Sequence, residues 1–199
     1  MKLGLALSGG GIRGIAHAGV LKALEDNGIK IDMIGGTSAG SLIAVLYAME
    51  YSPYYIYTLF KKYSKDIVSI SATPIVSGIS SFMKNKNVKI KGLKTGTSIE
   101  KIYDEIAIKK GIKSIEDIKM PIAIPTVDLL DSKEYVFTNQ IQENNKEKYI
   151  TDISIGKAVR ASSSFPAVFC PCEYKKHLFM DGGALDNVPV CEVKNLRSR

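Results

Sequence analysis

Short apolar runs alternate with longer helical stretches along this chain, so strands and helices are predicted in turn. The first two runs, residues 2–7 and 31–35, each lead through a glycine-containing turn into a predicted helix, over 15–27 and 41–49. Further helices are expected over 52–63, over 97–111 and from Thr151 or Asp152 to Ala161, with strands over 121–128 and 134–138. Strands that alternate with helices build a mainly parallel sheet covered on both faces. The predicted fold class is therefore α/β, a three-layer α/β/α arrangement around a central, mainly parallel sheet.

Two local predictions refine this layout. The segment Thr97-Ser98-Ile99-Glu100 has the pattern of a capping box and should open its helix. That helix places one apolar face toward the core, formed by Ile99, Ile102, Tyr103 and Ile106. Residues 64–96 have only weak periodicity, and we expect them to form a lid or cap region.

The pentapeptide Gly36-Thr37-Ser38-Ala39-Gly40 has the form G-x-S-x-G and lies between a predicted strand and a predicted helix. In a nucleophile elbow, a serine occupies a sharp strand-to-helix turn, and the flanking glycines lack the Cβ atoms that would clash there. The serine hydroxyl then faces a helix N-terminus, whose free N–H groups and dipole can stabilise an oxyanion. We therefore predict that Ser38 is a catalytic nucleophile.

A second glycine-rich turn, residues 8–14, follows the first predicted strand. One interpretation is a dinucleotide-binding loop, because residues 9–14 satisfy G-x-G-x-x-G after a strand. That fingerprint requires an acidic residue at the end of the second strand, whereas Asp32 lies at its beginning and Ser38 follows its end. The other interpretation is an oxyanion hole, whose bare backbone N–H groups can approach a tetrahedral intermediate. The residues favour the oxyanion hole, and a nucleotide-binding oxidoreductase remains the competing function.

Ser38 needs a base, and Asp181 is the predicted one. It follows a short apolar run and precedes two glycines, so we expect it on an exposed turn at a strand end. The chain has two histidines: His17 is expected beside the apolar face of the first helix, as a core residue, and His177 should point away from Asp181. A Ser-His-Asp triad in the α/β-hydrolase order would need a histidine after the acid, and none follows Asp181. A serine–aspartate dyad is therefore predicted.

Three motifs in this order resemble those of the patatin-like phospholipases: Gly-Gly-Gly-x-Arg-Gly after the first strand, G-x-S-x-G after the second, and Asp-Gly-Gly near the C-terminal end. The resemblance covers nearly the whole chain. It implies an architecture related to that of α/β-hydrolases and a serine lipid acyl hydrolase, a phospholipase A-type enzyme or esterase, that cleaves fatty-acyl esters through an acyl-enzyme. The implied partner is a lipid or phospholipid acyl ester. A catalytically silent lipid-binding protein with the same fold is a further alternative.

The resemblance also assigns roles to individual residues. It implies the catalytic dyad Ser38 and Asp181, and an oxyanion hole formed by Gly10, Gly11 and Ala39, with Arg13 nearby. The remaining motif glycines are Gly9, Gly14, Gly36, Gly40, Gly182 and Gly183. Segments 160–169 and 187–189 look like family features near the acyl pocket. This chemistry requires no metal and no organic cofactor.

Two departures from the family pattern are visible. Many relatives carry Asp where this chain has Ser8, which affects the anchoring of the glycine loop more than its N–H groups. The chain also stops shortly after Pro189, where relatives usually continue into another strand and helix. We therefore expect one patatin-like domain over residues 1–199 that is short or truncated at its C-terminal end.

Composition fits one enzyme domain. With 199 residues, 45% of them hydrophobic, the chain can bury one sizeable core. It contains no apolar run of transmembrane length and no signal-peptide pattern at its start. Its three cysteines form no evident framework, and an odd number favours reduced thiols. The cytoplasm is the expected location.

The net charge of +7 comes almost entirely from lysine. Nucleic-acid binders favour arginine forks with aromatic platforms, and no such array appears, so no nucleic-acid partner is expected. Residues 82–94 interleave lysines with apolar residues. This pattern suits peripheral contact with an anionic membrane, but a solvated loop accounts for it at least as well.

Overall fold

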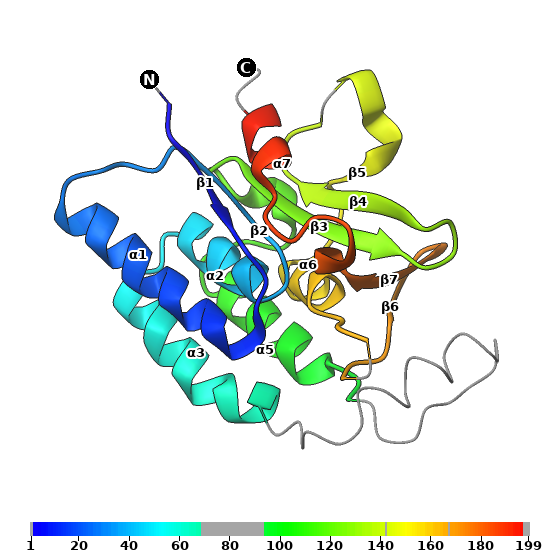
Figure 1. Cartoon of the computed structure of the whole chain (residues 1–199), viewed down its shortest axis with the longest axis horizontal. Coiled ribbons are helices and arrows are strands. Elements are labelled where there is room, and N and C mark those ends of the chain that lie inside the picture. The colour runs from blue at the N-terminus through cyan, green and yellow to red at the C-terminus, as the bar shows by residue number, and fades with distance from the viewer. Residues whose placement is uncertain (1, 69–93, 142, 167, 197–199) are drawn as a thin grey trace.

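The structure, a computed structural model of the chain, describes residues 2–68, 94–141, 143–166 and 168–196 (Figure 1). The strands are β1 (Gly4–Leu7), β2 (Met33–Gly36), β3 (Ile122–Asp128), β4 (Lys133–Thr138), β5 (Tyr149–Ile150), β6 (Cys172–Tyr174) and β7 (His177–Asp181). The α-helices are α1 (Ile15–Asp26), α2 (Ala39–Ala48), α3 (Pro53–Val68), α5 (Thr97–Ile108), α6 (Ile155–Ser162) and α7 (Val190–Asn195). Short 3₁₀ turns include Gly11–Gly14 after β1 and Gly182–Ala184 after β7.

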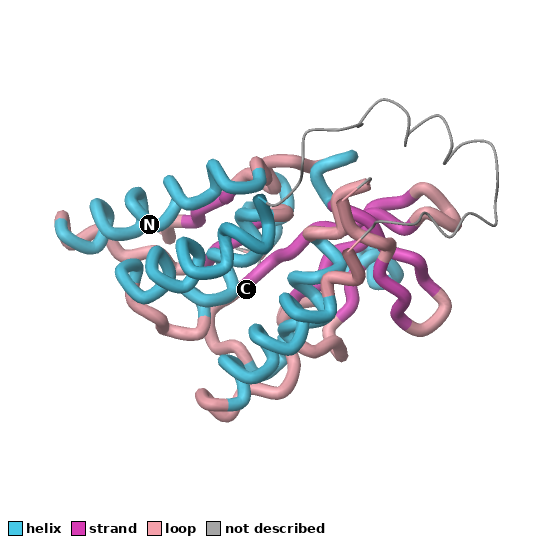
Figure 2. The backbone as a smooth tube through the Cα atoms, turned by 90° about the horizontal axis from the view of Figure 1, so that it is seen from below, coloured by secondary structure: helices cyan, strands magenta, loops and turns pink. Residues whose placement is uncertain are grey.

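The strands form one sheet, in which the pairing changes from parallel to antiparallel at β3. β1 pairs with β2, and β2 with β3, in parallel, and β5 is parallel to β4. β4 and β7 are antiparallel to β3, and β6 is antiparallel to β7. Helices flank the strands, as Figure 2 shows from below. The fold is mixed α/β with a mainly parallel central sheet flanked by helices, which confirms the predicted fold class.

Two strands share one edge of β3. β2 pairs with residues 122–123 of β3 in parallel, and β7 pairs with residues 126–128 in the antiparallel direction. Pro125 lies between these segments, and because proline has no N–H to donate, it suits a break in the ladder. β2 and β7 therefore approach this break from opposite directions.

The consequence is a meeting of two strand ends. β2 ends at Gly36, two residues before Ser38, and β7 ends at Asp181. Both C-terminal ends point toward the break beside Pro125. The sheet thus brings Ser38 and Asp181 together although they are far apart in the sequence.

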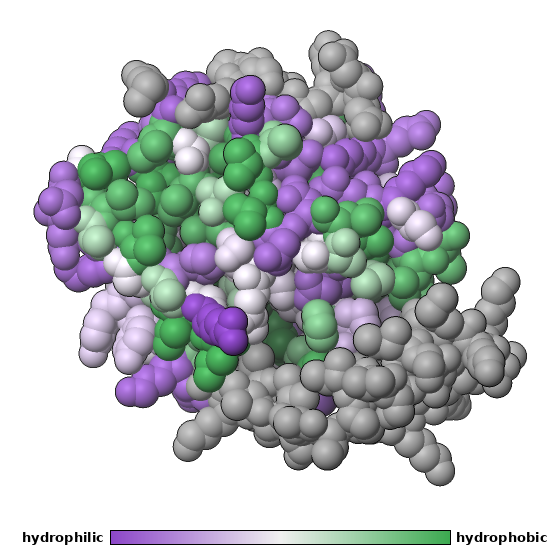
Figure 3. Space-filling view, viewed as in Figure 1, coloured by the Kyte–Doolittle hydropathy of each residue, from purple (hydrophilic) through white to green (hydrophobic). Residues whose placement is uncertain are grey.

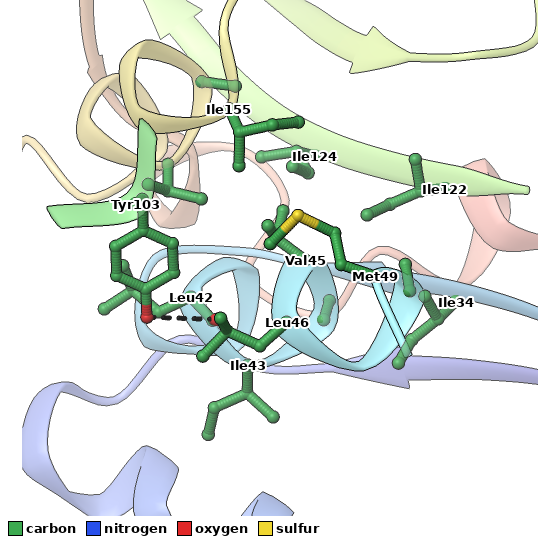
Figure 4. Close-up of a cluster of buried hydrophobic side chains, with 14 of the residues drawn as sticks. Ile34, Leu42, Ile43, Val45, Leu46, Met49, Tyr103, Ile122, Ile124 and Ile155 are labelled. Carbon is green, nitrogen blue, oxygen red and sulfur yellow. Dashed lines mark hydrogen bonds between the residues drawn. The ribbon is translucent and has the colours of Figure 1, made fainter. Parts of the chain in front are cut away.

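The two faces of the sheet pack against different helices, because successive side chains of a strand point to opposite faces. On one face, strand residues of the larger core cluster face α2; Figure 4 shows Ile122 and Ile124 opposite Val45 and Met49. On the other face, a smaller cluster joins the sheet to α7, with Met33, Ala123, Val136, Val193 and Leu196 as its buried members. α2 is buried along nearly its whole length, which explains its almost uninterrupted apolar sequence.

The predicted capping box of α5 is wrong. The helix begins at Thr97 as expected, but its N-cap is Gly96, with a left-handed φ of 72° and no side-chain cap. Glu100 instead extends to the ammonium of Lys157 at 2.9 Å. The predicted apolar face of α5 is confirmed: Tyr103 and Ile106 are buried, and the other two members pack against the same core.

The predicted start of α6 is also wrong. Ser154 is the N-cap, and its Oγ accepts the N–H of Lys157 at 3.3 Å. The two residues favoured from the sequence have other partners: the Thr151 hydroxyl donates to Glu116, and Asp152 pairs with Lys175. Contacts distant in sequence therefore outweigh the local capping preference.

Most of the predicted lid or cap lies outside the described residues. Of residues 64–96, residues 64–68 complete α3 and residues 94–96 lead into α5. The lysine-rich stretch 82–94 lies outside as well, except for Lys94. Within the part of the chain that the structure describes, no helix is long and apolar enough to cross a membrane.

Candidate active site

Ser38 occupies a tight turn between β2 and α2. Its backbone has φ 52° and ψ −121°, a region that L residues rarely adopt. The flanking glycines allow this turn, because a Cβ on Gly36 would lie 2.3 Å from the carbonyl oxygen of Gly40, and one on Gly40 would lie 2.4 Å from that of Leu7. The strained backbone and the close approaches have the geometry of a nucleophile elbow.

Asp181 is buried at the end of β7, not exposed on a turn as the sequence suggested. Its Oδ1 accepts the N–H of Gly183 at 2.8 Å. Its Oδ2 is buried and accepts no hydrogen bond of ordinary geometry from the described residues. Burial raises the pKa of Asp181, while the nearby Ser38 hydroxyl and the Gly183 N–H lower it by a smaller amount. The carboxylate is thus a stronger base than an exposed aspartate and lies beside the serine hydroxyl.

The glycine loop presents backbone N–H groups next to the elbow. Gly10 and Gly11 have φ of 153° and 57°, and the carbonyl of Gly10 accepts the N–H of Arg13 at 3.2 Å. Within the described ranges, no hydrogen bond uses the N–H groups of Gly10, Gly11 or Ala39. These donors are available to a ligand oxygen, as an oxyanion hole requires. The side chain of Arg13 is exposed.

The other motif glycines hold the loops of the site close together. Gly14 packs against Ala39, since a Cβ at Gly14 would lie 2.7 Å from the Cβ of Ala39. Gly9 donates its N–H to the carbonyl of Asn187 at 3.1 Å. Gly182 lies against the carbonyl of Pro125, and Gly183 lies near the Asn187 side chain.

The Asp186-Asn187 turn ties the glycine loop to the elbow. Besides the contact with Gly9, the Thr37 hydroxyl donates to the carbonyl of Asp186 at 2.9 Å. The turn therefore contacts the residue before Ser38 and the loop that follows β1. The sequence singled out this region only through its family resemblance.

The C-terminal end of α6 contacts both halves of the predicted dyad. The Ser162 hydroxyl accepts the N–H of Ser38 at 3.1 Å and donates to the carbonyl of Pro125 at 2.7 Å. The carbonyl of Ser164 accepts the N–H of Asp181 at 3.1 Å. These contacts were not predicted individually, although three successive serines directly follow the helix that the sequence predicts to end at Ala161.

A buried arginine holds this segment in place through hydrogen bonds. Arg160 donates from Nη1 to the Ser164 hydroxyl at 3.0 Å and from Nε to the carbonyl of Thr95 at 2.8 Å. Its Nη2 also reaches the carbonyl of Cys170 at 3.0 Å. Arg160 therefore joins α6, the strap of residues 94–96 and the segment that follows α6.

The two histidines have structural partners. His17 is half-buried and its Nε2 lies 3.0 Å from the carbonyl oxygen of Ser8, at the start of the glycine loop. His177 lies 2.7 Å from Asp128 and stacks on Phe179. In the described part of the chain, neither ring is paired with Ser38 or Asp181.

Asp128, the partner of His177, is stabilised as a carboxylate. Burial opposes its ionisation, but hydrogen bonds from the N–H groups of Leu130 and Leu178 and from His177 outweigh burial and lower its pKa. This pair lies at the opposite end of β7 from Asp181 and belongs to the sheet.

The position of Asp32 weighs against dinucleotide binding. Asp32 precedes β2 and accepts the N–H of Leu3 at 2.7 Å. The end of β2, where a ribose-binding carboxylate would be needed, carries glycine followed by Thr37 and Ser38. Among the described residues, no group of histidine, cysteine, aspartate and glutamate side chains could hold a metal ion.

Several hydrophobic side chains are exposed around the site. They lie on the glycine loop, after α6 and after β7, namely Ile12, Phe165, Leu185 and Val188. Viewed as in Figure 1, the surface is hollowed near its centre and hydrophobic atoms lie in the hollow (Figure 3). Such surroundings suit a substrate with apolar parts.

Solved structures share this fold at low sequence identity. VipD from Legionella pneumophila has a TM-score of 0.54 and 18% identity, over 94% of this chain and 47% of VipD. The ExoU–SpcU complex of Pseudomonas aeruginosa gives a TM-score of 0.52 and 21% identity, over 84% of this chain and 37% of the matched one. These similarities establish the fold alone.

Curated relatives match more closely in sequence. Lysophospholipase NTE1 of Meyerozyma guilliermondii is 34% identical over 194 residues, and NTE1 of Candida albicans is 33% identical over 198 residues. The alignment covers 96% of this chain but only 12% of each relative. The model of the patatin-like phospholipase family, a family of hydrolases that act on ester bonds, matches residues 5–193. The chain belongs to the patatin-like phospholipase family.

Proposed function

We propose that the protein is a serine lipid acyl hydrolase in which Ser38 is the nucleophile and Asp181 the general base. The observation that carries this proposal is the meeting of the β2 and β7 ends, which puts the strained Ser38 turn beside a buried carboxylate. A base must lie within reach of the proton that it removes, and such hydrogen bonds are often long before substrate binds. The family membership of the chain supports the same chemistry.

The mechanism begins with attack of the Ser38 Oγ on the ester carbonyl carbon, while its proton passes to Asp181 Oδ2. The carbonyl oxygen becomes an oxyanion, and the N–H groups of Gly10, Gly11 and Ala39 stabilise it. The C–O bond to the alcohol then breaks, and the alcohol leaves with the proton from Asp181. Water, deprotonated by Asp181, attacks the acyl-enzyme, releases the fatty acid and restores the serine hydroxyl.

We propose a lysophospholipid as the substrate, since the curated relatives are named lysophospholipases. The exposed apolar residues around the site support an acyl substrate. Contact with an anionic membrane and a cytoplasmic location are also proposals, and they rest only on the lysine-rich sequence of residues 82–94 and on composition.

Labelling with a fluorophosphonate probe tests the nucleophile, because this reagent requires an activated serine. Wild-type protein should be labelled and should hydrolyse lysophosphatidylcholine, whereas Ser38→Ala should lose both activities and remain folded. Ser52→Ala is the matched control: it changes an exposed serine before α3, whose hydroxyl accepts the N–H of Tyr55, and it should keep labelling and hydrolysis at the wild-type rate. Labelling of Ser38→Ala at the wild-type rate would remove Ser38 from the mechanism.

A further inference from the structure

One peptide group of the glycine loop is hydrogen-bonded on both sides. Its carbonyl oxygen, from Ser8, lies 3.0 Å from Nε2 of His17 on α1. Its N–H, from Gly9, donates to the carbonyl of Asn187 at 3.1 Å. A carbonyl oxygen can only accept a hydrogen bond, so Nε2 of His17 must carry a proton and donate it. Because a peptide group is planar, two partners on opposite sides fix its orientation.

The glycines that follow this peptide group do not fix their own orientation. Gly10 and Gly11 have φ of 153° and 57°, and without a Cβ atom each can adopt many backbone conformations at little cost. The carbonyl of Gly10 accepts the N–H of Arg13 at 3.2 Å, which holds the peptide group that carries the Gly11 N–H. The peptide group that carries the Gly10 N–H lies between this one and the one held by His17. The direction of the Gly10 N–H therefore depends on both contacts.

The Ser8 carbonyl also lies against the elbow that carries Ser38. A Cβ on Gly40 would lie 2.7 Å from the Ser8 carbonyl oxygen. A shift of this carbonyl would therefore displace the glycine loop relative to the nucleophile as well. The contact with His17 involves the backbone of Ser8, so it does not depend on the Ser8 hydroxyl.

We propose that His17 is a positioning residue that holds the Gly10 N–H in the direction required to bind the oxyanion. The inference rests on the proposed acyl hydrolase function, since the oxyanion forms when Ser38 attacks an ester. Donors of an oxyanion hole are effective because their direction is fixed before the reaction. Among the described residues, His17 hydrogen-bonds to the loop backbone and not to Ser38 or Asp181, so it acts through the Ser8–Gly9 peptide group.

Steady-state kinetics with p-nitrophenyl acetate tests this role. His17→Ala should lower kcat by about tenfold or more with little change in KM, because the N–H contact is made mainly in the transition state. His17→Gln should retain most of the wild-type kcat, since its amide nitrogen lies about as far from the backbone as Nε2 of histidine and can donate. His17→Asn has the same amide on a shorter side chain and should resemble His17→Ala.

His177→Ala is the matched control, because it removes the other histidine, which lies at the opposite end of β7 from Asp181. It should lower the free energy of unfolding in urea and leave kcat near that of wild type. A kcat of folded His17→Ala equal to that of His177→Ala would overturn the proposal. Equal kcat in His17→Gln and His17→Asn would overturn it as well, because the donor at the position of Nε2 would then have no effect.

Hydrogen exchange of the Gly9 amide, followed by NMR, separates this inference from the proposed function because it requires no substrate. Without His17 the Ser8–Gly9 peptide group should open more often, so the Gly9 amide should exchange about fivefold faster or more in His17→Ala, but not in His177→Ala. Wild type that shows this dependence on His17 but hydrolyses no ester would contradict the acyl hydrolase and retain His17 as the residue that holds the loop. Equal exchange in the two variants would contradict the role of His17 whatever the hydrolysis shows.

Discussion

The Ser162 hydroxyl accepts the backbone N–H of Ser38 at 3.1 Å and thereby ties the end of α6 to the elbow. The same hydroxyl donates to the carbonyl of Pro125, at the break in pairing along β3. One small side chain thus connects the strained turn to the point where β2 and β7 meet. We infer that Ser162 is a positioning residue for Ser38.

Replacement of Ser162 by alanine should lower turnover more than substrate binding. The N–H of Ser38 would lose its partner, and a displacement of a reacting group by 1 Å can cost about 10²-fold in rate. We expect kcat for a short ester to fall by about tenfold or more while KM changes little, with a parallel fall in the rate of fluorophosphonate labelling. Ser163→Ala, at the next residue, is the matched control. The Ser163 Oγ is buried and has no hydrogen-bond partner among the described residues, so its removal should leave kcat unchanged. A kcat of Ser162→Ala equal to that of Ser163→Ala would show that the contact does not position the nucleophile.

Much of the fold could be predicted because local patterns were strong. The alternation of apolar runs with helical stretches locates β1, α1, β2 and α2 within a residue or two of their observed bounds. The elbow could be predicted because a turn this tight has no room for a Cβ atom on either side of Ser38 and therefore requires glycines at fixed positions. The close approach of Gly36 to Gly40 shows this requirement.

What could not be predicted depends on contacts between distant segments. Pro125 within a strand argues against a central position, and only the shared edge of β3 shows how the sheet accommodates it. The burial of Asp181 arises from β7 inserting beside that break, which no pattern around Asp181 itself indicates. Ser162 contacts Ser38 across 124 residues of sequence, so its role could be seen only in the folded chain.

Asp181→Asn should stabilise the protein at neutral pH while abolishing most activity. Burial raises the pKa of Asp181 in the native state above 3.8, its value in an unfolded chain. Ionisation of Asp181 is therefore less favourable in the native state than in the unfolded chain, and it lowers the free energy of unfolding. The penalty is absent at about pH 3 and grows as the pH rises from 3.8 through the raised native pKa of Asp181. Each kcal/mol relieved should raise Tm by about 2–4 °C in a chain of this size, whereas loss of the base should reduce kcat by about 10²–10⁴-fold.

Thermal unfolding over a pH series checks this prediction. The Tm advantage of Asp181→Asn should shrink as the pH falls, and in wild type kcat/KM should decline on the acid side at a pH above the ordinary aspartate value. Asp26→Asn, an exposed carboxylate at the end of α1, provides the control and should follow wild type in both measurements. A Tm of Asp181→Asn below that of wild type at neutral pH would contradict the assigned effect of burial.

His177→Ala should destabilise the protein without removing activity. Asp128 would lose one partner of a buried carboxylate, which costs about 1–3 kcal/mol. Because the pKa of Asp128 is lowered, its stabilising effect is present above the unfolded value of 3.8 and is lost as the pH falls toward its native pKa. Chemical denaturation should therefore show a smaller difference between wild type and variant in acid than at neutral pH. A folded His177→Ala protein as inactive as Ser38→Ala would replace the dyad by a histidine-dependent mechanism.

Gly10→Ala should reduce turnover through the backbone. A Cβ at Gly10 has room, with its nearest neighbour at 3.9 Å, but φ is 153° there and strains any other residue. The N–H proposed for the oxyanion hole would tilt, and this contact is made mainly in the transition state, so kcat should fall by about 10-fold or more with little change in KM. Gly19→Ala, which replaces an exposed glycine within α1, meets no atoms within 4 Å and controls for the added methyl group. Steady-state kinetics on a soluble ester would decide, and an effect on KM alone would argue against an oxyanion role.

Arg160→Ala should lower both stability and the rate of ester cleavage, because this side chain holds several segments at once. Its removal leaves the carbonyls of Thr95 and Cys170 and the hydroxyl of Ser164 without their shared donor, at a cost of about 3 kcal/mol or more in the free energy of unfolding. Arg160→Lys should recover little of this loss, since an ammonium cannot reproduce the planar set of donors. Lys157→Ala, one turn earlier on α6, removes only a partly exposed ion pair with Glu100 and should cost about 0–1 kcal/mol. Urea unfolding of the three variants measures these differences, and a stability of Arg160→Lys equal to wild type would mean that charge alone, not the directed hydrogen bonds, holds the strap against α6.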